Sequence, residues 1–223
     1  MPKGQAPVAE RAGCRQYQKG KEAEIDMGSS SLSLVAPIFR YLLCIRMHNV
    51  LDIGIGESGL WGFLIRHYFD SDNFGRHFSN KDTWRIKITG MEVYENYHTP
   101  VHDYCYDDIL WGDATTTIDY IPHQDCSPKF DTVIFSCTIE HMEKEVAYQF
   151  IQRLKKYMHH GGSLIIATYN GFAPKDEYDG NNGDAHKSGW LLNDFDRILE
   201  MGFEMVMNEV DEFNHLIVIL KRK

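Results

Sequence analysis

Residues 50–59 read VLDIGIGESG, an apolar run that leads into three glycines, Gly54, Gly56 and Gly59. The run has the length of a buried strand, and residues 58–69 have the apolar spacing of a helix. Glycine allows a tight turn and a close approach of the backbone to a ligand, while the first N–H groups of the helix point at the same place. We therefore expect a strand, a ligand-binding turn and the start of a helix here.

Two acidic side chains indicate the charge of that ligand. Asp52 stands directly before the glycines, and Glu57 lies among them. Dinucleotide enzymes hold a pyrophosphate at such a turn, and two nearby carboxylates would repel it by several kcal/mol at an effective dielectric constant of about 20. The acids therefore favour a ligand with a positively charged end and disfavour a nicotinamide-dependent dehydrogenase.

The rest of the chain alternates between strand-like and helix-like segments. Apolar runs predict further strands at 85–91, 107–111, 129–136, 163–169, 203–210 and 215–221. Periodic spacing predicts helices at 32–44, capped from Ser29–Ser31, at 144–159, ended by Gly161 and Gly162, and at 194–201. This order predicts an α/β fold of the Rossmann-like, doubly wound type. We expect a mostly parallel seven-stranded sheet with a C-terminal antiparallel hairpin and helices on both faces.

The two ends of the chain differ in character. Residues 1–28 are polar and aperiodic, which predicts a mobile tail, and residues 29–223 are expected to form a single domain. The stretch 170–189 is rich in Gly, Asn and Asp, and loops of that length are usually functional or mobile. Whether it acts as a lid is left open.

The composition is that of a globular protein with an excess of negative charge. The 223 residues carry a formal net charge of −9, which weakens long-range attraction to nucleic acid. Arg153, Lys155 and Lys156 form a local basic patch with residues 221–223, or, in the interpretation we favour, solvated charges at the ends of elements. The five cysteines are scattered without a CxxC pair, and no apolar stretch is long enough to cross a bilayer. We expect a cytoplasmic protein with reduced thiols and no membrane partner.

The segment VLDIGIGESG resembles the first motif of the class I S-adenosylmethionine-dependent methyltransferases. The resemblance implies S-adenosylmethionine as cofactor and S-adenosylhomocysteine as product. Three later strand ends agree in order: Glu92 for the ribose hydroxyls, Asp113 for the adenine amino group or as a helix N-cap, and SCTIEH at residues 136–141 for the cofactor and the start of the acceptor pocket. The cofactor-binding residues that it implies are Asp52, Gly54, Gly56, Gly59, Glu92, Val93, Gly112, Asp113, Ala114 and Ser136.

Within that family the chain looks closest to a small bacterial, archaeal and phage branch. The branch has an EHxxKE segment, a TPNG-like turn and an HxSGW segment, and this chain reads IEHMEKE, TYNG and HKSGW. Tyr169 stands where the branch often has proline, so the shape of this turn does not follow from the resemblance. The substrates of the branch are poorly defined, and the resemblance therefore implies the reaction and not the acceptor.

Candidate catalytic residues follow the fourth and fifth strands. A hydroxyl acceptor needs a base, and histidine is suited to take its proton. His141 and His186 are the candidates, each with a purely structural alternative, and Glu140 would orient a histidine or accept from an amine. Tyr94, Tyr97 and Trp111 either stack on adenine or belong to ordinary packing.

We expect no metal site from the spacing of the 11 histidines. His98 and His102 are four residues apart, but Pro100 lies between them and disrupts a helical pair. Cys137 and His141 have the same spacing without a second matching pair.

The favoured function is methyl transfer to a hydroxyl or amine of a small molecule, such as a sugar or metabolite precursor. RNA and protein acceptors stay open. DNA is disfavoured, because SCTIEH stands where DNA amino-methyltransferases carry an Asn/Asp-Pro-Pro-aromatic segment. A non-catalytic cofactor-binding module of the same fold is the further alternative, and the oligomeric state is left open.

Overall fold

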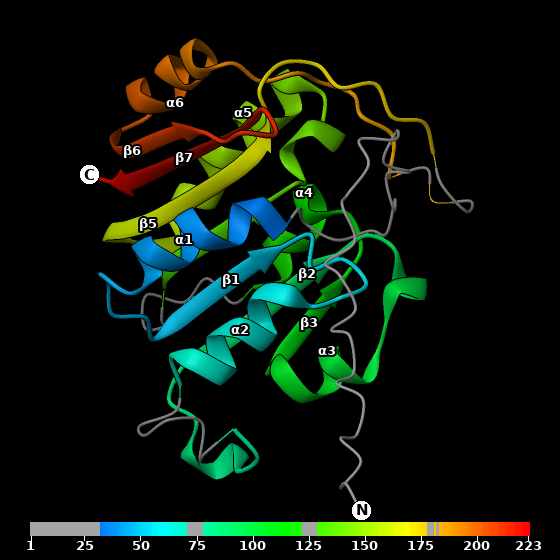
Figure 1. Ribbon diagram of the computed structural model, residues 1–223, viewed down its shortest axis with the longest axis vertical. Helices are drawn as coiled ribbons and strands as arrows, with labels where there is room; N and C mark the ends of the chain where they lie inside the picture. Colours follow the sequence, from blue (N-terminus) through cyan, green and yellow to red (C-terminus); the bar gives the residue numbers. More distant parts are fainter. Residues whose placement is uncertain (1–31, 71–77, 122–128, 178–180, 182) are drawn as a thin grey trace, which may run out of the picture.

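The computed structural model describes residues 32–70, 78–121, 129–177, 181 and 183–223. The predicted tail at 1–28 and the predicted helix cap Ser29–Ser31 lie outside these residues. One seven-stranded sheet has the order β3-β2-β1-β4-β5-β7-β6 (Figure 1). Its strands are β1 (Asn49–Ile53), β2 (Lys87–Glu92), β3 (Asp108–Trp111), β4 (Phe130–Ser136), β5 (Met158–Tyr169), β6 (Phe203–Val210) and β7 (His215–Arg222).

The pairing confirms the predicted fold class. Strands β1 to β5 pair in parallel, and β7 is antiparallel to both β5 and β6. The order reverses between β1 and β4, which makes the carboxyl ends of these two strands the switch point where doubly wound sheets bind ligands.

Helices cover both faces of the sheet, in three layers. They are α1 (Val35–Leu42), α2 (Leu60–Tyr68), α3 (Pro100–Cys105), α4 (Ala114–Thr117), α5 (Lys144–Leu154) and α6 (Asp196–Glu200). Figure 1 shows α1 and α2 across one face and α4 and α5 behind it. Successive strand residues alternate between the two cores: Val50 packs with α1 and α2, whereas Leu51 packs with α5. The longest helix of the described residues, α5, has 11 residues, and none could span a membrane.

The predicted helix at 144–159 is wrong in its last part. Helix α5 ends at Leu154, a 3-10 turn follows, and Met158 begins β5. Met158 pairs with Phe130, and the next pair in the ladder joins Thr132 to Ser163. The chain between Met158 and Ser163, including both glycines, therefore bulges out of the β5 strand. Met158 is buried as the first residue of β5, and its helical spacing from Leu154 could not predict this pairing.

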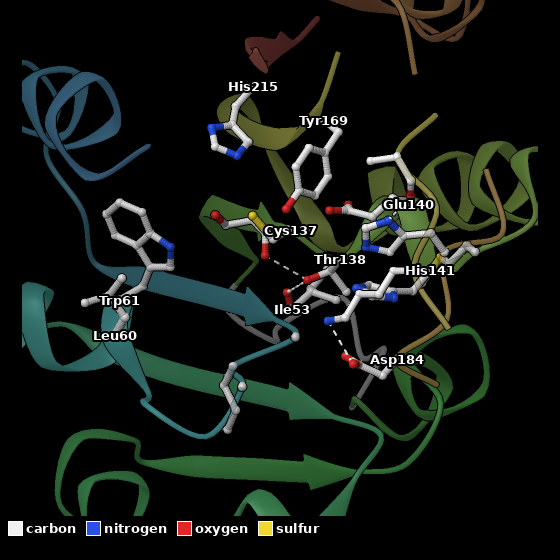
Figure 2. Close-up of a pocket in the computed structure, with 18 of the residues that line it drawn as sticks. Ile53, Leu60, Trp61, Cys137, Thr138, Glu140, His141, Tyr169, Asp184 and His215 are labelled. Carbon is white, nitrogen blue, oxygen red and sulfur yellow. Dashed lines mark hydrogen bonds and ion pairs between the residues drawn. The ribbon is translucent and has the colours of Figure 1, made fainter. Parts of the chain in front are cut away.

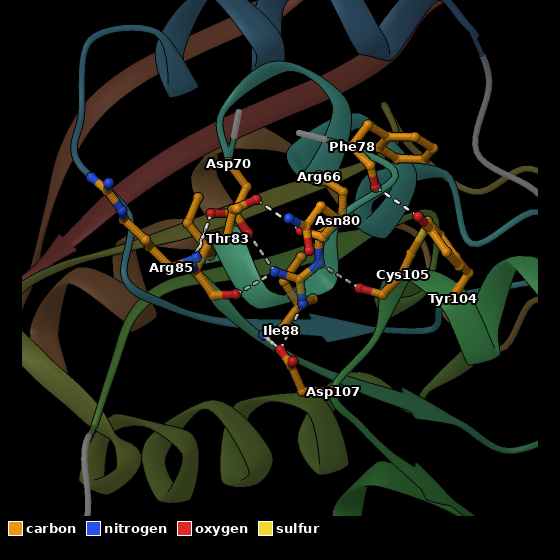
Figure 3. Close-up of polar contacts among 11 residues, drawn as sticks. Arg66, Asp70, Phe78, Asn80, Thr83, Arg85, Ile88, Tyr104, Cys105 and Asp107 are labelled. Carbon is orange, nitrogen blue, oxygen red and sulfur yellow. Dashed lines mark hydrogen bonds and ion pairs between the residues drawn. The ribbon is translucent and has the colours of Figure 1, made fainter. Parts of the chain in front are cut away.

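A buried arginine ties α2 to the amino ends of β2 and β3 (Figure 3). Arg66 is fully buried, and its guanidinium donates to Asp70 at 2.6 Å, to Asp107 at 2.7 Å and to the carbonyls of Cys105 and Ile86. Buried charge is tolerated where it is paired and hydrogen-bonded, and here each of the three guanidinium nitrogens has an acceptor. The network fixes the helix that follows the glycine turn.

Candidate functional site

A pocket of about 1160 Å³ opens at the carboxyl ends of β1, β2, β3 and β4. All the residues expected to bind the cofactor line it, except Asp52 and Gly59. Glu140, His141 and His186, the expected catalytic residues, line it as well. Figure 2 shows Leu60 and Trp61 on one side of the pocket and Glu140 and His141 on the other. The structure thus joins the two predicted groups in one cavity.

The glycine turn has a conformation that other residues rarely adopt. Gly54 has φ +75° and Gly59 has φ +56°, both in the left-handed region. A Cβ atom on Gly54 would lie 2.1 Å from Oγ1 of Thr138, which itself lies 3.1 Å from the Ile53 carbonyl oxygen. The turn after β1 is therefore packed against the segment after β4, with no room for a side chain between them.

Asp52 does not line the pocket. It is buried in β1, and the Tyr106 hydroxyl donates to its carboxylate at 2.6 Å. Burial raises the pKa of Asp52 to about 7, against the opposing effect of that hydrogen bond. The same hydroxyl accepts from the Gly62 N–H at 3.2 Å, so Asp52 and Tyr106 connect β1 to α2.

Glu92 connects the end of β2 to the glycine turn and lines the pocket. Its carboxylate accepts from the Gly56 N–H and from the Tyr94 N–H, each at 3.0 Å. Burial raises its pKa, while these N–H groups act in the opposite direction. A carboxylate has about four acceptor positions, so Glu92 keeps capacity for a ligand hydroxyl.

His102 supports the glycine turn, a contact that the sequence did not predict. Its Nδ1 accepts from the Thr99 N–H at 2.9 Å, and its Nε2 therefore carries the proton donated to the Gly56 carbonyl at 2.9 Å. Burial lowers the pKa of His102, which favours the neutral ring. Only the tertiary contact with the glycine turn distinguishes it from His98, which pairs with Asp103 at 2.7 Å.

Asp113 is the predicted N-cap of α4 and also belongs to the pocket lining. It lines the pocket, and its side chain caps α4 by accepting from the Thr115 N–H at 2.7 Å. Among the aromatic candidates, Tyr97 lines the pocket, whereas Tyr94 and Trp111 do not.

Glu140, His141 and His186 come together from two segments far apart in the chain. Glu140 and His141 end a 3-10 turn after β4, and the Glu140 carbonyl accepts from the N–H groups of Lys187 at 2.8 Å and Ser188 at 3.0 Å. The two histidine rings lie edge to face with their centroids 4.8 Å apart. The backbone contacts explain why His186 reaches the end of β4.

Burial alters the proton affinity of both residues after β4. Glu140 is 2% exposed, and among the described residues no donor forms a hydrogen bond of good geometry to either carboxylate oxygen. Burial raises the pKa of Glu140 to about 7, and burial together with the neighbouring His186 lowers the pKa of His141 to about 4. At neutral pH the His141 ring is therefore uncharged.

Tyr169, the departure from the TPNG-like pattern, lines the pocket at the end of β5. Its ring lies 5.4 Å from that of His186 and 5.0 Å from that of His215, between centroids. Cys137, also in the lining, has φ +49°, a strained value for a residue with a side chain.

Part of the predicted 170–189 loop lies outside the described residues.

Half of the six basic residues at 153–156 and 221–223 make contacts within the chain. Arg153 pairs with Asp119 and donates to the Thr115 carbonyl, and Lys155 donates to the Met201 carbonyl. Arg222 donates to the Met158 carbonyl. These contacts favour element-end charges over a binding patch.

Several solved structures with a similar fold are methyltransferases. A SAM-dependent methyltransferase from Archaeoglobus fulgidus is similar over 85% of this chain and 93% of its own, with 18% identity and a TM-score of 0.57. The magnesium protoporphyrin IX methyltransferase from Synechocystis, solved with bound SAH, has 16% identity and a TM-score of 0.55 over 85% and 82% of the two chains. The 1,6-didemethyltoxoflavin-N1-methyltransferase from Burkholderia thailandensis, with bound 1,6-didemethyltoxoflavin and S-adenosylhomocysteine, has 13% identity and a TM-score of 0.54 over 85% and 77%.

No protein-family model and no curated protein sequence matches the chain. At these identities the similarity concerns the fold. The chain has the Rossmann-like fold of these S-adenosylmethionine-dependent methyltransferases.

Proposed function

We propose that this protein is an S-adenosylmethionine-dependent methyltransferase that transfers a methyl group to a hydroxyl or amine of a small molecule, such as a sugar or metabolite precursor. The observation that carries the proposal is the single pocket that joins the glycine turn, Glu92 and Asp113 to Glu140, His141 and His186. The arrangement provides one end for a donor and one for an acceptor.

At the donor end, S-adenosylmethionine would lie over the glycine turn. Glu92 would accept from the ribose hydroxyls, and Asp113 from the adenine amino group. Gly54, Gly56, Gly112 and Ala114 would let the backbone approach the ligand, with Val93 and Ser136 beside it. Asp52 and Gly59 would act indirectly, because they support the turn and do not line the pocket.

At the acceptor end, the reaction needs alignment first and a proton acceptor second. A lone pair of the acceptor forms a bond to the methyl carbon, the carbon–sulfur bond breaks, and sulfur keeps the electron pair as a neutral thioether. Orientation of this kind supplies on the order of 7 to 11 kcal/mol in favourable cases. We assign the acceptor's proton to the group of Glu140, His141 and His186.

The size and charge of the pocket support a small acceptor. Pockets for a single ligand usually hold about 300 to 1000 Å³, so 1160 Å³ leaves room for donor and acceptor together. The net charge of −9 opposes a polyanionic acceptor such as RNA. An RNA or protein acceptor, or a cofactor-binding module without catalysis, are the alternatives that the test below addresses.

A ligand panel tests the proposal. S-adenosylmethionine or S-adenosylhomocysteine at 100 times its Kd should stabilise the protein by about 2.7 kcal/mol, whereas NAD and NADP should not. Release of S-adenosylhomocysteine is then measured with pooled sugars and metabolite precursors, bulk RNA and unfolded protein. Stabilisation by NAD alone would contradict the proposal, and cofactor binding with no turnover on any pool would favour the non-catalytic module.

A further inference from the structure

Three side chains of metal-binding type meet at the acceptor end of the pocket. Glu140, His141 and His186 each offer one ligand atom, and these atoms lie within 4.8 Å of one another. All three side chains line the cavity. Two imidazoles and one carboxylate are the donor set of many catalytic Zn²⁺ sites and of the facial triads that hold Fe²⁺.

The Glu140 carboxylate is an independent indication of a cation. It is 98% buried, and among the described residues no donor forms a hydrogen bond of good geometry to either oxygen, although the Glu140 backbone N–H and the Thr168 hydroxyl act on the carboxylate. A buried carboxylate without a well-formed hydrogen bond is costly, and such groups in native proteins call for an explanation such as an ion. Figure 2 shows Glu140 beside His141, with Tyr169 on the same side of the pocket.

Both histidines are oriented as metal ligands commonly are. Nδ1 of His186 lies 2.5 Å from the Ala173 carbonyl oxygen, and Nδ1 of His141 lies 3.3 Å from that of Ala185. A carbonyl oxygen can only accept, so each Nδ1 carries the proton and each Nε2 carries the lone pair. Metal-bound histidines usually donate their second N–H to a carbonyl or carboxylate in this way.

We propose that Glu140, His141 and His186 bind one divalent transition-metal ion, whose open coordination positions face the pocket and take an oxygen of the acceptor. In a tetrahedral site, two ligands at about 2.1 Å from an ion lie about 3.4 Å apart, so ligand atoms up to 4.8 Å apart must draw together by about 1.4 Å on binding. Side-chain rotation provides a movement of that size. The nearby cation Lys175 is paired with Asp184 at 2.8 Å, which offsets its repulsion of the ion.

The ion would determine which class of acceptor the site takes. This inference about the acceptor rests on the proposed function. A hydroxyl bound to a divalent ion loses its proton more readily. The proton would leave to water, because the three side chains to which the metal-free reaction assigns it would then hold the ion. The lone pair left on oxygen would form the bond to the methyl carbon, and the carbon–sulfur electrons would pass to sulfur. The ion keeps its oxidation state. A site with more than one open position favours acceptors that carry a second oxygen next to the reacting hydroxyl.

Metal binding is measured on the full-length protein after treatment with a chelator, with no S-adenosylmethionine present. Mn²⁺ and Co²⁺ are titrated by calorimetry, because thiols bind Mn²⁺ poorly, and the visible bands of Co²⁺ report its coordination. One ion per chain is expected. Glu140→Gln, His141→Ala and His186→Ala should each weaken binding at least tenfold.

The control is His160→Ala, which removes an exposed histidine from β5. It should leave metal affinity unchanged, and circular dichroism checks that every variant is folded. No saturable binding by the native protein would overturn the proposal, and so would unchanged affinity in the His186 variant. Binding of S-adenosylhomocysteine to the metal-free protein is tested separately, so a failure of the metal site and a failure of the proposed function give different results.

Discussion

The Tyr106 hydroxyl lies 2.6 Å from the Asp52 carboxylate and holds this acid inside the protein, between β1 and α2. The acid next to the glycines was expected to face a cationic ligand, and it instead joins the strand to the helix that frame the turn. Its influence on a ligand is therefore exerted through the shape of the turn.

Asp52 should make the stability of the protein depend on pH. Its pKa rises from the ordinary value of 3.8 to about 7 on folding, so the native state holds a proton that the unfolded state releases between these values. The free energy of unfolding should therefore fall as pH rises from about 4 to 7. Asp52→Asn removes this contribution and should gain on the order of 3 kcal/mol relative to wild type between pH 5 and pH 8. Urea unfolding at both pH values measures the difference.

Asp176→Asn, at an exposed aspartate, is the matched control and should not change the pH dependence. An Asp52 variant that follows the wild-type curve would show that this carboxyl is ionised in the folded protein.

Gly54→Ala should abolish cofactor binding. The new methyl group would lie 2.1 Å from Thr138 Oγ1, at a φ of +75°. Either the turn or the segment after β4 must move, at a cost of about 1 to 3 kcal/mol. Calorimetry with S-adenosylhomocysteine and urea unfolding measure the two effects.

Gly161→Ala separates steric conflict from backbone strain. Gly161 has a nearly identical φ of +76°, but a Cβ atom there would meet nothing within 4 Å. This variant should be destabilised and still bind the cofactor. Equal loss of binding in both variants would mean that lowered stability alone explains the loss of cofactor binding in Gly54→Ala.

Glu92→Gln should weaken cofactor binding at least tenfold and lower stability by about 1 to 3 kcal/mol, because one buried N–H loses its acceptor. The amide keeps one carbonyl oxygen for the Gly56 or Tyr94 N–H, but it loses the second carboxylate oxygen and the charge offered to the ribose hydroxyls. The Kd of S-adenosylhomocysteine is measured beside Glu95→Gln, an exposed neighbour that should bind normally. Unchanged affinity in the Glu92 variant would remove this residue from the proposed site.

His141→Ala should keep cofactor affinity and lower turnover. The ring lies at the acceptor end, next to His186 and away from the glycine turn. Once an acceptor is identified, kcat should fall at least a hundredfold while the Kd of S-adenosylhomocysteine stays within about twofold. Loss of cofactor binding would instead mean that His141 supports the structure of the pocket.

The order of helices and strands could be predicted because each element has a local sequence pattern, either an apolar run or a helical spacing of apolar residues. Residues 50–69 give the strand, the turn and the helix. The apolar runs give the remaining strands, most clearly β4, since a buried parallel strand is apolar on both faces. The same reasoning failed at Met158, whose apolar side chain suits a helix and a strand equally. Pairing with Phe130, far away in sequence, decided between them.

The sequence by itself determined the fold class, the place of the ligand-binding turn and most of the residues around it. The reason is that strand ends of a parallel sheet converge at one edge whatever the details of packing. Only the tertiary structure turned Asp52 toward Tyr106, placed His102 against Gly56 and brought His186 to Glu140 and His141. These contacts depend on which segments the folded backbone brings side by side, and residue spacing along a chain carries no information about that.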